Sequence, residues 1–130
     1  RQALEKVLAE LASRTADFRQ YHEISGKFHD IIVELSGNRR LQGIYHGLAQ
    51  HVSRLRTLSL AIRGRPEISL RGHRRIATAI LRGQGAEAER AMLTHIDAAY
   101  NVLRRTVHGA AMRPASEPTG EGLYGQRRSK

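Results

Sequence analysis

The chain has 130 residues, a formal net charge of +10 and no cysteine. This length suits a single domain, and the absence of cysteine excludes disulfides and thiolate metal sites, which fits a reducing compartment. No apolar run is long enough to cross a membrane and no signal peptide is visible, so we expect a cytoplasmic protein. Aromatic residues are scarce and do not alternate with basic ones, which argues against a platform for single-stranded nucleic acid.

Apolar residues recur at helical spacing in five segments, and no segment has the alternation typical of a strand. The predicted helices span residues 2–14, 17–35, 39–63, 66–82 and 86–107. Residues 109–130 hold two of the three prolines and no periodicity, so we predict an irregular tail. The predicted fold class is therefore all-α: an antiparallel helical bundle over 1–108, with short connections.

The second predicted helix, 17–35, begins after Thr15 or Asp17, either of which could cap it. Its apolar residues form one stripe: Ile24, Phe28, Ile31, Ile32 and Leu35. His29 lies at the edge of this stripe and should point inward, with Ser25 one turn earlier on the same face. Gly26 lowers the helix propensity of the segment and leaves room for a neighbouring helix or a ligand.

Three histidines fall on the inward stripes of three different predicted helices: His29, His73 and His95. A helical bundle can bring such side chains together in its core, and neutral imidazoles bind Zn, Ni or Mn. The alternative is that each histidine is buried separately, with its own hydrogen-bond partner. The spacing leaves both interpretations open, because no short motif such as HExxH is present.

The remaining histidines are predicted to lie outside this site. His22 precedes His29 by seven residues on the same helix face, about 10 Å along the axis, which is too far to share a metal easily. We expect it to support the site from outside or to lie on the surface. His46, His51 and His108 are expected at the surface.

Two arginines of the third predicted helix, Arg54 and Arg56, are candidates for binding an anion. A guanidinium group in a central pocket can bind a carboxylate through two parallel hydrogen bonds. Residues two positions apart on a helix cannot face the same way, so only one of the two can turn inward. The alternative for either is a solvated helix face.

Three motifs occur in a characteristic order. They are Phe28-His29 with Ile32, Ser36-Gly37-Asn38 and Leu41; His73 with Ile76, Ala79-Ile80 and Gly83; and Ala88 with Met92 and His95-Ile96. Over about residues 2–107 this order resembles the FCD domain, the C-terminal effector domain of the FadR branch of GntR-type transcription regulators. The resemblance implies a helical bundle that binds a small metabolite, often a carboxylate, and often holds a divalent metal with one Asp and three His.

The resemblance carries over residue by residue, with one departure. The three metal-binding histidines correspond to His29, His73 and His95, but the Asp of the family pattern D-x-x-x-H is replaced by Ser25. A neutral hydroxyl is a weaker metal ligand than a carboxylate. A three-His site completed by water or by the effector, and a pocket without metal, therefore both remain open. The predicted effector site comprises Ser25, His29, Arg54, Arg56, His73 and His95.

The resemblance also implies partners. They are a small organic acid, a second copy of the chain in a homodimer, and DNA, which such regulators bind through an N-terminal winged helix-turn-helix. Nothing in this sequence resembles that DNA-binding part, and we expect the first helix of the effector domain to be absent or truncated.

We predict that the chain is the effector-binding and dimerisation domain of such a regulator and not an enzyme. One alternative is a metal-dependent enzyme that activates water, but Glu23, Asp30 and Asp97 are not predicted to stand beside the histidines as a general base. The other is a basic module that binds nucleic acid directly with steep salt dependence. The positive charge is spread along the chain rather than clustered, which argues against that module.

Overall fold

The computed structural model describes residues 1–111. In this range the chain forms five α-helices: α1 (Gln2–Ala12), α2 (Phe18–Leu35), α3 (Arg39–Leu60), α4 (Arg65–Leu81) and α5 (Gly85–Ala111). The predicted all-α fold is confirmed, and most helix ends lie within three residues of their predicted positions. Helix α5 continues past its predicted end at 107, and residues 112–130 of the predicted tail lie outside the described residues.

Side chains at the helix starts explain where α2 and α3 begin. Of the two candidate caps, Asp17 is the one that acts: its carboxylate accepts a hydrogen bond from the Gln20 amide at 2.9 Å. Asn38 does the same for α3, accepting from the Leu41 amide at 3.1 Å. Gly37, between the two helices, has φ of +62°, a left-handed conformation that glycine adopts without strain. The break between the predicted helices 17–35 and 39–63 is therefore confirmed.

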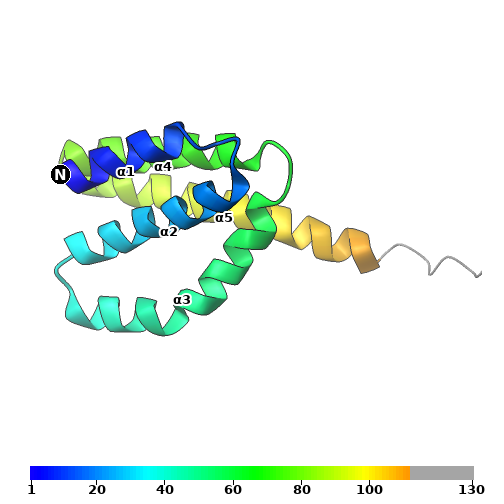
Figure 1. Cartoon of the computed structure of the whole chain (residues 1–130). Helices are drawn as coiled ribbons and strands as arrows, with labels where there is room; N and C mark the ends of the chain where they lie inside the picture. The colour runs from blue at the N-terminus through cyan, green and yellow to red at the C-terminus, as the bar shows by residue number, and fades with distance from the viewer. Residues whose placement is uncertain (112–130) are drawn as a thin grey trace, which may run out of the picture.

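The helices pack so that α2 and α5 lie between the α1–α4 pair and α3 (Figure 1). The core consists mainly of side chains from α1, α2 and α4: Leu4, Val7, Leu11, Tyr21, Phe28, Leu60, Leu70, Ile76, Ala77 and Ala91. Figure 1 also shows the C-terminal part of α5 extending beyond the other helices. Because α2 and α5 both pack against α4, inward residues of these three helices share one interior region.

The apolar residues of α3 recur at helical spacing and define one face, which is only partly covered. Tyr45 and Val52 are partly buried. The other members of that face are exposed: Leu41, Ile44, Leu48, Leu55, Leu58 and Ile62. On α5 the residues that helical spacing places on the inner side are partly buried: Ala88, Met92, His95, Ala99, Val102 and Leu103. A second apolar stripe of α5 faces outward: Leu93, Ile96, Tyr100 and Val107. Helical periodicity identifies an apolar face but not the surface that covers it.

No helix in the described part of the chain is long and apolar enough to cross a membrane.

Candidate metal centre

The three predicted histidines meet in the interior. His29 comes from α2, His73 from α4 and His95 from α5, and one ring nitrogen of each lies within 4.8 Å of the other two. The Nε2 atoms of His29 and His73 are 3.3 Å apart. Two imidazole nitrogens on one tetrahedral metal, each at its usual bond length, are about 3.3–3.4 Å apart. These distances confirm that the three histidines come together as predicted, and the spacing of the His29 and His73 nitrogens suits a shared metal.

The surroundings of the cluster keep these imidazoles neutral. The rings of His73 and Phe28 lie 4.3 Å apart, and Tyr21 stacks on His73 at 6.5 Å. Burial lowers the pKa of His29 to about 3 and the pKa of His95 to about 4, and it lowers the pKa of His73 well below its usual value. At neutral pH each ring therefore retains a lone pair that can bind a metal or accept a hydrogen bond.

His73 is not satisfied by the protein alone. It is fully buried, and its Nδ1 atom has no hydrogen-bond partner among the described residues. Its Nε2 atom lies 3.3 Å from the Nε2 atom of His29. Buried polar atoms are nearly always paired, so the interpretation of separately satisfied histidines does not account for this ring.

Two glycines make room for the side chains of the site. A Cβ atom on Gly72 of α4 would lie 2.5 Å from Nδ1 of His95, closer than real contacts allow. A Cβ atom on Gly26 of α2 would lie 2.9 Å from Nη2 of Arg56. The space predicted at Gly26 is thus occupied by an arginine side chain. The role of Gly72 was missed, although a glycine next to His73 within a predicted helix was an available signal.

Of the two candidate arginines, Arg56 is the one turned towards the site. Its guanidinium group lies over Gly26, and its Nε atom is buried without a hydrogen-bond partner in the part of the chain that the structure describes. Burial is the largest cause of the lowered pKa of His29 and His73, and the neighbouring imidazoles come next. The positive charge of Arg56 is a further, smaller cause. Arg54 is exposed on the other side of α3.

Ser25 occupies the position expected for the fourth ligand. It is 1% exposed, lies one turn before His29, and its Oγ atom has no hydrogen-bond partner within residues 1–111. Among the described residues, no carboxylate joins the three histidines within ligand distance. The donor set is therefore three neutral nitrogens, with a neutral hydroxyl nearby.

The other histidines lie outside the cluster. His22 of α2 contacts α3 instead: its Nε2 atom is 3.2 Å from the Ser53 carbonyl oxygen and 3.0 Å from Oγ1 of Thr57. His46, His51 and His108 are exposed, as predicted.

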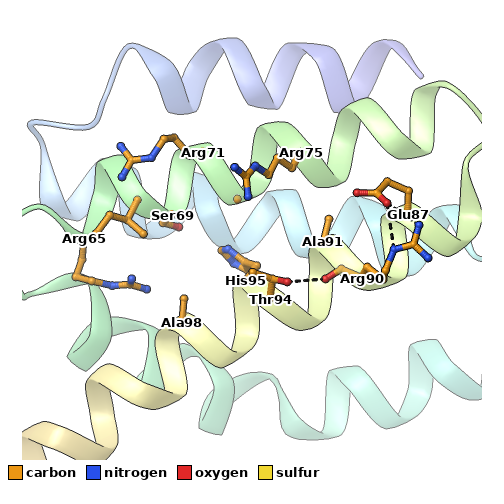
Figure 2. A pocket seen from close by; sticks show the side chains of 12 residues that line it. Arg65, Ser69, Arg71, Arg75, Glu87, Arg90, Ala91, Thr94, His95 and Ala98 are labelled. Carbon is orange, nitrogen blue, oxygen red and sulfur yellow. Dashed lines mark hydrogen bonds and ion pairs between the residues drawn. The ribbon is translucent and has the colours of Figure 1, made fainter.

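One residue near the cluster was not predicted. Arg65, the first residue of α4, is 5% exposed, and its charge contributes after burial to the lowered pKa of His95. It lines a cleft of about 270 Å³ between α4 and α5, to which His95 also belongs (Figure 2). Its position between Gly64 and Pro66 indicated only a helix boundary, so the sequence held no signal for a buried cation.

The fold and the cluster define a class: an all-α domain whose interior gathers three neutral imidazoles, with Arg56 and Arg65 nearby. The chain belongs to the FCD domain family, whose model matches residues 1–98. FCD domains are typically the effector-binding domains of GntR-family regulators and are regulatory rather than enzymatic. No curated protein and no solved structure matches the chain.

Proposed function

We propose that this chain is the effector-binding and dimerisation domain of a transcription regulator of the GntR family and FadR type. In this proposal it binds a small carboxylate in its interior, where His29, His73 and His95 hold a divalent metal. The observation that supports it best is the convergence of three neutral imidazoles, two of them with Nε2 atoms 3.3 Å apart.

The donor set fits a metal of the Zn or Ni type better than Mn, because imidazole suits the first two and carboxylates suit the third. Three protein ligands leave coordination positions for water or for the effector. A metal bound there would supply a positive charge and an open coordination position for the effector's carboxylate. The catalytic alternative gains nothing from this site, since no carboxylate among the described residues stands beside the cluster as a general base.

Arg56 is the residue we assign to the carboxylate. Its fork of donors can form two parallel hydrogen bonds with a carboxylate that also reaches the three histidines. Ser25 can donate one more hydrogen bond, since its hydroxyl is buried and has no partner among the residues that the structure describes. Arg54 is left out of the assigned site, because its side chain is exposed.

The signal would pass through a change in arrangement between two copies of the domain. A ligand that prefers one arrangement shifts the population towards it, which changes the spacing of attached DNA-binding domains. The outward apolar stripes of α3 and α5 support a dimer, because contiguous exposed apolar surface typically marks an interaction site. DNA binding by an N-terminal domain and a cytoplasmic location are parts of the same proposal.

Metal analysis tests the site directly. Protein purified without a nickel column should contain about one metal ion per chain, and His29→Ala should lose it. His51→Ala is the matched control, because this histidine is exposed and should leave the metal content unchanged. Added metal at 100 times its Kd should raise the free energy of unfolding of the apo protein by about 2.7 kcal/mol. No uptake of Zn, Ni or Mn by the wild type would overturn the metal part of the proposal.

A further inference from the structure

The cleft between α4 and α5 reaches the same histidine cluster from a second side. Its volume is about 270 Å³, near the lower limit for ligand pockets, which suits a small metabolite. Arg65 and Ser69 line its buried part together with His95, whereas Arg71 and Arg75 are exposed at its mouth. In Figure 2 the guanidinium group of Arg65 extends from α4 towards the side of α5 that carries Ala98 and His95.

Arg65 is a buried cation without a counterion. Its one side-chain hydrogen bond in the described structure is a long one, from Nη2 to Oγ of Ser59 at 3.4 Å, and its Nε atom has no partner. The ion pairs among the described residues are Lys27–Glu23 and Arg90–Glu87, so none involves Arg65. The one acidic residue that lines the cleft in the described structure, Glu87, is thus already paired.

An unpaired buried charge is costly, and structures usually compensate it with an opposite charge. Here the compensation must come from outside the described residues. The hydroxyl group of Ser69 also lines the cleft and can donate a hydrogen bond to an anion, whereas the hydroxyl of Thr94 donates to the Arg90 carbonyl oxygen at 2.9 Å.

We propose that the α4–α5 cleft is a second anion subsite, in which Arg65 binds the far anionic group of an effector whose near carboxylate lies at the three histidines. The effector class is therefore a small molecule with two anionic groups: a dicarboxylate or a phosphorylated carboxylic acid. This inference rests on the proposed function, because it places the near carboxylate at the histidine cluster.

Matched pairs of small anions test the inference on the metal-loaded protein by calorimetry. Succinate is compared with butyrate, and phosphoglycolate with glycolate, so that each pair differs by one anionic group. Succinate should bind the wild type 10-fold or more tightly than butyrate, or phosphoglycolate 10-fold or more tightly than glycolate. The pair with the larger ratio identifies the far group as a carboxylate or a phosphate. Ratios near one in both pairs would overturn the inference.

Arg65→Met tests the residue. The variant should bind butyrate and glycolate like the wild type. It should lose the preference for succinate over butyrate or for phosphoglycolate over glycolate. Arg74→Met, which replaces an exposed arginine of the same helix outside the cleft, is the control and should keep that preference. Unchanged butyrate affinity also shows that the variant is folded. Should Arg65→Met fail to fold, Ser69→Ala in the buried part of the cleft should reduce the preference instead, and an unchanged ratio would count against the subsite.

The two proposals fail in different ways. If His73→Ala abolishes binding of both members of a pair and Arg65→Met changes neither affinity, the proposed function stands and the second subsite is refuted. Binding of neither member, with or without metal, would overturn both.

Discussion

At the scale of single residues, the site depends on what is missing from two positions. Ser25 places a hydroxyl where the family pattern has a carboxylate, and Gly72 places a hydrogen atom where any side chain would collide with His95. The first absence lowers the negative charge of the donor set, and the second allows the third imidazole to reach the cluster. Each absence can be reversed by one substitution.

Ser25→Asp should raise metal affinity by about 10-fold or more, because it adds a fourth, negatively charged ligand one turn before His29. Competition with a chromogenic zinc chelator measures this. Ser25→Asn is the control, since it adds similar volume without charge and should leave the affinity near that of the wild type. Equal affinities for the Asp and Asn variants would show that position 25 does not face the metal.

Gly72→Ala should displace the His95 ring, because the new Cβ atom would lie 2.5 Å from Nδ1. We expect loss of metal binding and destabilisation by about 1–3 kcal/mol, the usual cost of overpacking. Gly47→Ala is the matched control: it is also a helical glycine, but a Cβ atom there meets nothing within 4 Å. That variant should gain about 0.5–1 kcal/mol from helix propensity. Metal titration and urea unfolding report both effects, and a Gly72→Ala protein as stable as the wild type would contradict the packing argument.

At the scale of elements, the cluster requires α2, α4 and α5 to pack around uncharged rings. Each helix contributes one histidine, and Phe28 and Tyr21 of α2 contribute the aromatic surroundings of His73. Protonating any of the three rings would place a positive charge beside Arg56 or Arg65 in a buried region. The packing of these three helices is therefore coupled to pH.

The apo protein should lose stability as the pH falls below about 6.5, the ordinary pKa of these imidazoles. In the folded chain the pKa of His29 is about 3 and that of His95 about 4, so between these values and 6.5 the unfolded chain binds protons that the folded chain excludes. The loss should reach at most about 1.4 kcal/mol per pH unit for each histidine, and it should be absent above pH 7.

Urea unfolding between pH 4.5 and 8 in the presence of a chelator measures this profile. His29→Gln should reduce the slope, whereas His51→Gln, which replaces an exposed histidine, should leave it unchanged. A flat profile from pH 7 to pH 5 would show that the cluster opens to solvent before it titrates.

At the scale of the whole molecule, two apolar stripes remain uncovered. On α3 the stripe includes Ile44 and Leu48, which are 64% and 51% exposed, and on α5 it includes Tyr100 at 60%. Exposed large apolar residues are ordinary when isolated, but here they recur at helical spacing on two helices that contact each other. This arrangement is the physical basis of the proposed dimer.

Leu48→Glu should convert the dimer to a monomer, because it places a charge in the middle of the α3 stripe. Gln50→Glu, which adds the same charge on another face of α3, should remain dimeric. Analytical ultracentrifugation at micromolar concentration distinguishes the two. A monomeric wild type would remove the support that these stripes lend to dimerisation.

Local patterns were sufficient to predict the five helices, the breaks between them, and the three inward histidines. These features depend on neighbours within a few residues, such as the Asp17 carboxylate and the Gln20 amide, or on a periodicity that points one face inward.

Only the tertiary structure decided the remaining features, because they depend on which faces of separate helices meet. It turned Arg56 rather than Arg54 towards the cluster, placed Gly72 against His95, and left most of the apolar face of α3 in solvent. It also buried Arg65, a residue at a helix boundary where no periodicity applies. Contacts between residues far apart in the sequence leave no trace in local spacing, so only the packed chain shows that this cation and His95 share a cleft.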